Sequence, residues 1–182
     1  MLKALFLFLF SIGLGLWSVL TFGPSLTPPL VAAVFGCACA AFLAVRAARK
    51  KRPRWAVVDG SNVLYWRRDE PNLHSVRLVI EKLVAAGFEP VIWFDANVGY
   101  LVADRYMNPY KLSQALHYPE NRIYVAPKGT PADPLLIQAA TDLSAPIVSN
   151  DRFRDWKEQF PQVDQAELFL RGEIVKGGVR LR

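Results

Sequence analysis

Trp55-Ala56-Val57-Val58-Asp59-Gly60-Ser61-Asn62 is the stretch that decides the fold of the last two-thirds of this chain. In it, a short apolar run ends in an acidic residue and a tight turn. A second run, Pro146-Ile147-Val148-Ser149, leads into Asn150-Asp151 in the same way. Apolar runs of this length, with helix-like segments between them, indicate buried strands of a parallel sheet. Because the carboxyl ends of such strands share one edge, where ligands bind, we expect the acidic residues that follow them to converge in space.

The same alternation continues through residues 55–182 and predicts one α/β domain. Apolar residues at helical spacing predict a helix over 73–86 that stops at Gly87. Asp133-Pro134 is expected to begin another helix, with Asp133 as its N-cap. The other predicted elements are strands over 90–94 and 122–125, mixed structure over 100–116 broken at Pro109, a short helix over 152–160 and a terminal strand or hairpin over 167–179. The predicted architecture is a doubly wound α/β sandwich with a central parallel sheet.

Four carboxylates are candidates for one site at the shared edge: Asp59, Asp133, Asp151 and Asp155. At the end of a buried strand, the Asp59 carboxylate loses its hydration unless a cation or a backbone donor meets it. A helix that begins near residue 151 would present Asp151 and Asp155, four residues apart, on one face. Like charges repel unless a cation neutralises them, so the pattern predicts a metal site. Oxygen ligands of this kind favour Mg²⁺, with Mn²⁺ as an alternative.

Each acid also has an ordinary structural interpretation. Asp59 suits a turn, Asp133 suits the capping of a helix, and the last two acids suit a solvated helix surface. Asp95 follows the predicted strand over 90–94 and is a candidate for the outer part of the site. The metal interpretation and the structural one therefore both stay open for each position.

Other chemistries that parallel sheets support fit this sequence less well. No Gly-x-Gly-x-x-Gly follows the first strand, and no Gly-Lys-Ser/Thr phosphate loop is present. Phosphatases with an aspartyl nucleophile usually carry a second acid two residues later, where this chain has Ser61. No Cys/His zinc spacing occurs either. The remaining chemistry is metal-assisted attack of water on a phosphodiester, in which the ion polarises the phosphoryl oxygen and lowers the pKa of bound water.

The first 54 residues have a different character. Two apolar stretches, residues 1–22 and about 26–45, are each near the roughly 20 residues that a membrane-spanning helix needs. We therefore predict a transmembrane helical hairpin over 1–45 and a basic juxtamembrane linker over 46–54. The basic linker predicts that the domain faces the cytoplasm. A cleaved signal peptide is the alternative for the first stretch, although its apolar run is longer than a signal core.

The net charge of +6 does not argue for nucleic-acid binding once it is divided by region. Seven of the 22 basic residues lie before residue 55, whereas all 16 acidic residues lie after it. The domain is therefore close to neutral, at −1. The basic excess belongs to the membrane linker, where each cation contributes roughly 1 kcal/mol of attraction to anionic headgroups.

Taken together, the motifs resemble a known family. Val58-Asp59-Gly60-Ser61-Asn62-Val63, Asp133 at the start of a helix, and Val148-Ser149-Asn150-Asp151-Arg152-Phe153-Arg154-Asp155 are similar to the NYN branch of PIN-like nucleases, of the Regnase (MCPIP) type. The resemblance spans about residues 55–167. It implies a PIN-like α/β/α sandwich and a Mg²⁺-dependent endoribonuclease. By the same resemblance, the four acids hold metal and act in catalysis, with Asn62 and Asn150 as supporting groups.

Substrate contacts are predicted beside the acidic elements. The candidates for binding RNA, single-stranded or looped, are Ser61, Arg67, Lys128, Asn150 and Arg152. Tyr65 and Trp66 offer stacking faces, or else pack into the core. The rival hypothesis is a catalytically silent, membrane-tethered module that binds RNA or protein on the same fold. DNA as the substrate and a dimeric state both stay open.

Overall fold

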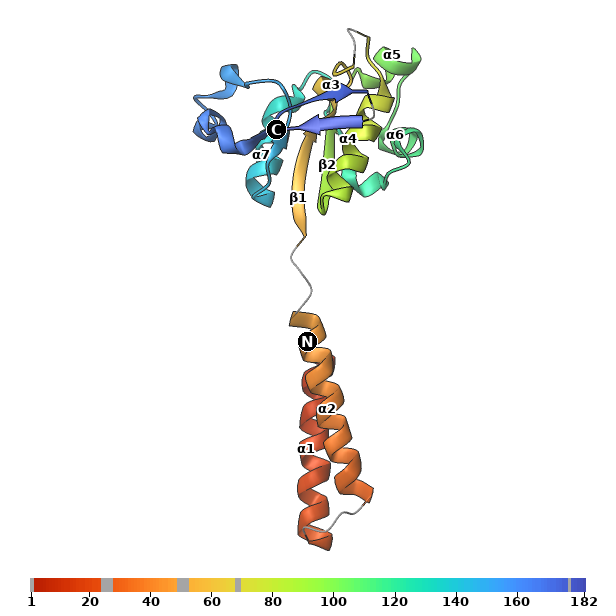
Figure 1. Cartoon of the computed structure of the whole chain (residues 1–182), viewed down its shortest axis with the longest axis vertical. Coiled ribbons are helices and arrows are strands. Elements are labelled where there is room, and N and C mark those ends of the chain that lie inside the picture. The colour runs from red at the N-terminus through yellow and green to blue at the C-terminus, as the bar shows by residue number, and fades with distance from the viewer. Residues whose placement is uncertain (1, 24–27, 49–52, 68–69, 177) are drawn as a thin grey trace. The chain divides into compact units, whose positions relative to one another are not determined.

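The computed structural model describes residues 2–23, 28–48, 53–67, 70–176 and 178–182. The chain forms two compact units, Met1–Arg52 and Pro53–Arg182. The N-terminal unit consists of two helices packed as an antiparallel hairpin, α1 (Leu2–Phe22) and α2 (Pro28–Ala48) (Figure 1).

This hairpin buries small residues and exposes large ones. Ser11 and Ala33 are buried, whereas Leu20 and Phe35 are 84% and 71% exposed. By length and composition, α1 is the one described helix that could cross a membrane, over Leu5–Phe22; a signal sequence passes the same test. The apolar part of α2, Val31–Arg46, is shorter. The predicted second span is therefore not confirmed and stays a prediction. Of the basic linker predicted over 46–54, residues 49–52 lie outside the described residues.

The C-terminal unit is built on a five-stranded parallel sheet in the order β3-β2-β1-β4-β5. Its strands are β1 (Arg54–Asp59), β2 (Phe88–Phe94), β3 (Ile123–Val125), β4 (Ile147–Val148) and β5 (Phe169–Leu170). The sequence predicted the first four strands. The fifth is only two residues long, too short to carry a periodic signal of its own, and was merged with the terminal hairpin.

Helices cover both faces of the sheet, which confirms the three-layer sandwich (Figure 1). On one face lie α4 (Leu73–Ala85), α5 (Val98–Ala103) and α6 (Pro109–Leu116), and on the other lies α7 (Ala132–Leu143). Each face of the sheet has its own hydrophobic core, and successive side chains of β1 point to opposite faces. Val58 packs in the core beneath α4, and Val57 packs in the core beneath α7. As predicted, α4 ends before Gly87, which adopts a φ of +81°.

Two local predictions are wrong. Helix α7 begins at Ala132 with Pro131 in the N-cap position, so Asp133 is inside the first turn and is not the cap. The segment over 152–160 is not one helix, because Phe153 has a φ of +50° and only a short 3₁₀ helix, Arg154–Trp156, follows it. Asp151 therefore does not share a helix face with Asp155.

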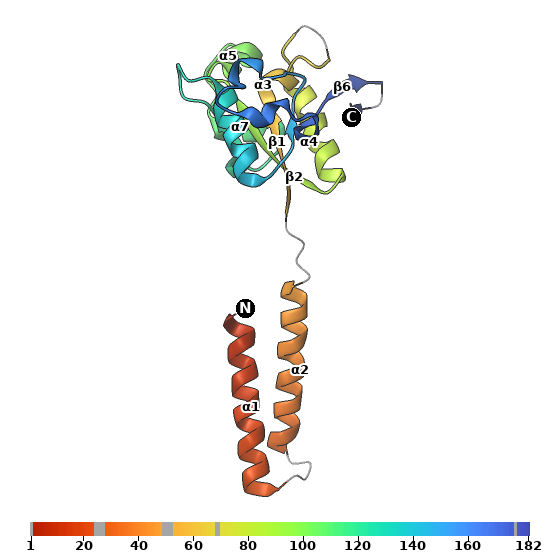
Figure 2. The same ribbon diagram turned by 90° about the vertical axis from the view of Figure 1, so that its left-hand side faces the viewer.

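The remaining elements of this unit are short. A single helical turn, α3 (Gly60–Val63), follows β1 directly, and the predicted terminal hairpin is present as β6 (Gly172–Val175) paired with β7 (Gly178–Leu181) (Figure 2). Further 3₁₀ helices span Glu120–Arg122, Pro161–Asp164 and Ala166–Leu168.

Candidate active site

The strand order places a candidate site at the carboxyl ends of β1 and β4. From β1 the chain moves through β2 to β3 on one side, and then returns to β4 and β5 on the other. Ligands of doubly wound sheets bind in the crevice at such a reversal. Asp59 is the last residue of β1, and Ser149 is the first residue after β4.

Asp59 is the most buried carboxylate of the site, at 7% exposure. One carboxylate oxygen accepts from the backbone N–H of Asn62 at 3.0 Å, and the other accepts from the Ser149 hydroxyl at 2.8 Å. Glycine is required at the next position, because a Cβ on Gly60 would lie 2.4 Å from the Phe94 ring. The close approach of α3 to β2 thus fixes where the Asp59 carboxylate points.

The pKa of Asp59 is raised from 3.8 to about 7. Burial is the largest cause, and the negative charges of Asp133 and Asp95 add to it, whereas the two hydrogen bonds oppose it. No described Lys or Arg side chain forms an ion pair with this carboxylate. Within the described residues, a buried acid thus lies near other acids and is paired with no Lys or Arg side chain.

Asp95 follows β2 and connects two loops of the site. Its backbone N–H donates to the Ser61 hydroxyl at 2.9 Å, and its carboxylate accepts from the N–H of Ala132 at 3.2 Å. Asp95 therefore caps α7 from a distant part of the sequence, in the role that had been predicted for Asp133.

Asp133 is consequently free of capping. Its carboxylate accepts from the Trp156 indole N–H at 3.1 Å. Its pKa is raised by burial and then by Asp151, Asp95 and Asp155, against the lowering effect of the Trp156 hydrogen bond. The acids whose charges raise these two pKa values are close neighbours. Five carboxylates therefore lie near one another at this edge of the sheet: Asp59, Asp95, Asp133, Asp151 and Asp155.

Two asparagines brace the loops around these acids. The Asn62 side-chain oxygen accepts from the Trp66 indole at 2.8 Å and from the N–H of Asn150 at 3.0 Å. The Asn150 amide pairs in both directions with the backbone of Gly172, at 2.8 and 3.1 Å. The loop after β4 is thus tied to α3 on one side and to the terminal hairpin on the other.

The donor set fits a hard divalent cation in its chemistry. All five groups are carboxylates, and Mg²⁺ binds through a few such oxygens together with substrate phosphate. In the part of the chain that the structure describes, no three Asp, Glu, His or Cys side chains converge closely enough to hold one ion. The observation in favour of a cation is the buried Asp59 carboxylate, whose pKa is raised and beside which the described residues place other carboxylates and no paired Lys or Arg.

Comparison with known proteins identifies the domain. A family model described as the Zc3h12a-like Ribonuclease NYN domain matches residues 52–168. The chain belongs to this NYN ribonuclease family. None of the curated proteins matches it.

Among solved structures, the NYN domain resembles Arabidopsis thaliana nuclear protein-only RNase P 2 (PRORP2), with a TM-score of 0.52 and 21% identity over 78% of this chain and 32% of that one. A crystal structure of PRORP2 from A. thaliana gives a TM-score of 0.48 and 20% identity over 83% of this chain and 34% of that one. This chain spans about a third of PRORP2, and the first likeness shows the fold. The family model and this fold confirm the NYN, PIN-like α/β prediction.

The predicted substrate residues of the NYN domain fall into two groups. Arg67, Lys128 and Arg152 are exposed, and their side chains form no hydrogen bond or ion pair with residues that the structure describes. Trp66 packs at the α4 core, whereas Tyr65 is 42% exposed. The Ser61 and Asn150 side chains are engaged in the loop contacts described above.

Sequence reasoning underrated Asp95 and missed Ser149 as a partner of Asp59. The signal for Asp95 was present, since it follows a buried strand as Asp59 does. Ser149 gave no signal, because its contact with Asp59 joins residues 90 positions apart. Its hydroxyl also accepts from the N–H of Asp151 at 3.0 Å.

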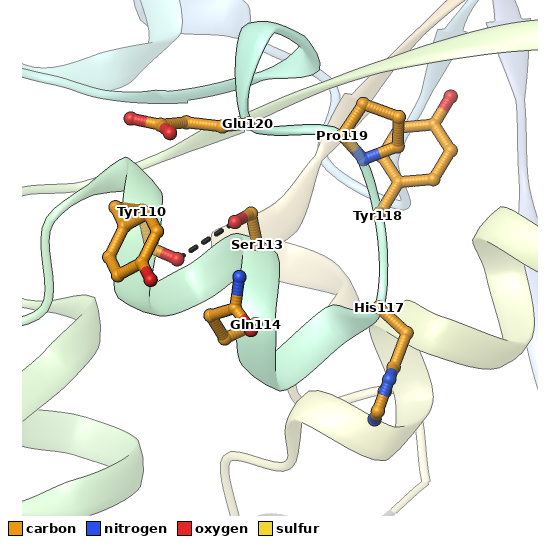
Figure 3. Close-up of a pocket in the computed structure, with 7 residues that line it drawn as sticks. All are labelled: Tyr110, Ser113, Gln114, His117, Tyr118, Pro119 and Glu120. Carbon is orange, nitrogen blue, oxygen red and sulfur yellow. Dashed lines mark hydrogen bonds between the residues drawn. The ribbon is translucent and has the colours of Figure 1, made fainter.

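A separate shallow pocket of about 500 Å³ lies at the end of α6 (Figure 3). It is lined by Tyr110, Ser113, Gln114, His117, Tyr118, Pro119 and Glu120, and the Ser113 hydroxyl donates to the Tyr110 carbonyl at 2.8 Å. It contains one carboxylate and none of the predicted site residues. The predicted site residues lie at the carboxyl edge of the sheet, apart from this pocket.

Proposed function

We propose that this chain is a membrane-anchored, Mg²⁺-dependent endoribonuclease that hydrolyses RNA phosphodiester bonds. The observation that carries the proposal is the buried Asp59 carboxylate, held by Asn62 and Ser149 near four other carboxylates at the carboxyl edge of the sheet, with its pKa raised to about 7. Membership of the NYN ribonuclease family supports RNA as the substrate.

Asp59, Asp133, Asp151 and Asp155 would hold Mg²⁺, with Asp95 joining them or supporting the start of α7. The bound ion supplies charge neutralisation at the phosphoryl oxygen and lowers the pKa of water. Ser149 and the Asn62 backbone orient the Asp59 carboxylate, and Asn62 and Asn150 keep the loop after β4 in place. The exposed cations Arg67, Lys128 and Arg152 are the groups that bind substrate phosphates.

Membrane anchoring is supported by the packing of the N-terminal hairpin, which buries small residues and exposes large apolar ones. Small residues fill the interface between its helices: a Cβ on Gly36 would lie 2.1 Å from the Ser11 hydroxyl, and one on Gly15 would lie 3.2 Å from Ala33. Small residues at helix contacts and large apolar residues outside are typical of helices packed in lipid. The basic residues of the linker support a cytoplasmic position for the NYN domain, because Lys and Arg are enriched on the cytoplasmic side of membrane-spanning segments. Resistance of the full chain to alkaline carbonate extraction checks the anchor, and recovery in the soluble fraction would contradict it.

Cleavage of a labelled, unstructured circular RNA tests the enzyme directly, because only an endonuclease can open a circle. We expect linear product with Mg²⁺, none with EDTA and none with Asp59→Asn. The matched control is Asp142→Asn, since Asp142 is exposed near the end of α7 and its side chain bonds, among described residues, only to Gln138; its activity should equal wild type. Equal cleavage by all samples would refute the proposal.

The same assay separates the rival functions. A circular single-stranded DNA of the same sequence distinguishes RNA from DNA as the substrate. RNA binding that persists in EDTA, without cleavage under any condition, would favour the catalytically silent binding module.

A further inference from the structure

The NYN domain carries an aromatic surface beside the carboxylates that the proposed chemistry does not use. On the face of the sheet that α7 covers, the helix lies against β1 and the neighbouring part of β2, and Val57 and Ile147 share a core with Leu136. Strand β3 is the edge strand on the other side of β1. There Tyr124 is 43% exposed.

Tyr124 is already part of a stack. Its ring lies 4.9 Å from the Trp93 ring at an interplanar angle of 17°. Trp93 is itself partly buried against the α7 core, so the pair has a fixed inner member. Among the described residues, no strand lies beyond β3 and no further ring stacks on Tyr124, so the stack ends there.

The strand register connects this stack to the proposed catalytic edge. Asp59 pairs with Trp93, and Trp93 pairs with Tyr124, so all three lie on one rung of the sheet. Neighbouring strands are about 4.8 Å apart, which puts the Cα atoms of Asp59 and Tyr124 roughly 10 Å from each other.

Positive charge lies on both sides of Tyr124 along the chain. Arg122 sits over the Trp55 ring, with its Cζ 4.2 Å from the ring centroid, and pairs with Glu89 at 2.9 Å. Lys128, in the loop that leads from β3 to α7, is exposed and forms no ion pair with a described residue. Cations interleaved with stacking rings are the features by which proteins hold single-stranded nucleic acid.

We propose that Tyr124 is the platform on which an unpaired base of the RNA substrate stacks, one or two nucleotides from the scissile phosphate. The inference rests on the proposed function. A base on the outer side of Tyr124 extends the existing stack with Trp93, and the backbone then runs past Lys128 toward Asp59. Stacking is tolerant of base identity, so the platform selects unpaired RNA and not a particular sequence.

The test uses the full chain in detergent micelles and a 12-nucleotide unstructured RNA. Single abasic sites, and separately single 2-aminopurines, are placed at each position in turn, and binding is measured in EDTA to prevent cleavage. We expect one abasic position to weaken binding about 5- to 100-fold and the 2-aminopurine at that position to be quenched.

Three variants assign the effect to the platform. Tyr124→Leu should lose both the abasic sensitivity and the quenching, whereas Tyr124→Phe should keep them. Tyr110→Leu is the matched control, because Tyr110 is 56% exposed and lies on α6 in the separate pocket; it should behave as wild type. The abasic scan on the wild-type protein needs no variant, so the proposal stays testable even if Tyr124→Leu fails to fold.

The outcomes separate this inference from the proposed function. Cleavage of RNA with no position-dependent abasic effect, or with Tyr124→Leu equal to wild type, would overturn the platform and leave the nuclease. Quenching at one position without cleavage would overturn the nuclease and leave the platform. Absence of both binding and cleavage would overturn both.

Discussion

Replacing Asp59 by asparagine is expected to make the NYN domain more stable above neutral pH. The wild-type carboxyl group is buried and has a pKa of about 7 in the folded state, against 3.8 for the unfolded chain. Between these values the folded protein holds a proton that the unfolded protein has lost. Stability from this group is therefore fully present below about pH 4 and declines until the pH passes 7.

The magnitude follows from the width of that window. Each pH unit changes the free energy of unfolding by about 1.4 kcal/mol for one proton. Three units give a loss of about 4 kcal/mol between pH 4 and pH 7. Asparagine is nearly the same size and cannot ionise: its oxygen can accept from the Asn62 N–H, and its amide can donate to the Ser149 hydroxyl. The free energy of unfolding of the variant should therefore not fall by this amount as the pH rises.

Urea unfolding of residues 53–182, which form a compact unit with both hydrophobic cores, measures the effect in EDTA between pH 4.5 and 8.5. The difference between wild type and Asp59→Asn removes titrations that the two proteins share. It should be about 1 kcal/mol at pH 4.5 and reach about 4 kcal/mol in favour of the variant at pH 8.5. A difference that stays flat, or that favours wild type as the pH rises, would refute the argument from burial.

Three further substitutions test the supporting geometry. Asp133→Asn should slow RNA cleavage roughly 100-fold or more, because it removes a proposed metal ligand, yet leave thermal stability equal or higher, since burial disfavours the ionised form. Asn150→Ala deletes the two hydrogen bonds to Gly172 and should lower the free energy of unfolding by about 1–3 kcal/mol in a urea titration; an unchanged midpoint would show that the hairpin does not brace the loop. Gly60→Ala brings a Cβ to 2.4 Å from the Phe94 ring, so it should lower the free energy of unfolding by about 1–3 kcal/mol and remove most of the RNA-cleaving activity. Full activity of this variant would contradict the tight fit described for α3.

The sequence predicted those parts of the molecule that depend on local pattern. Apolar runs followed by acids located β1 and β4, and the rule of the shared edge placed Asp59 near the loop after β4. Prediction from the sequence failed where the structure depends on contacts between distant residues. The cap of α7 comes from Asp95, 37 positions from Ala132, so a local rule assigned it to Asp133. The left-handed Phe153, buried and stacked on Phe169 at 5.8 Å, breaks a helix that charge spacing alone had favoured.

The affinity of the wild-type chain for Mg²⁺, measured by isothermal titration calorimetry at pH 8.5 and pH 6.0 and compared with Asp59→Asn, tests the central claim most directly. The account predicts binding at pH 8.5, about tenfold weaker binding at pH 6.0, where Asp59 holds its proton, and loss of binding in the variant. Equal Mg²⁺ affinity in wild type and Asp59→Asn, or no binding by wild type at pH 8.5, would contradict it.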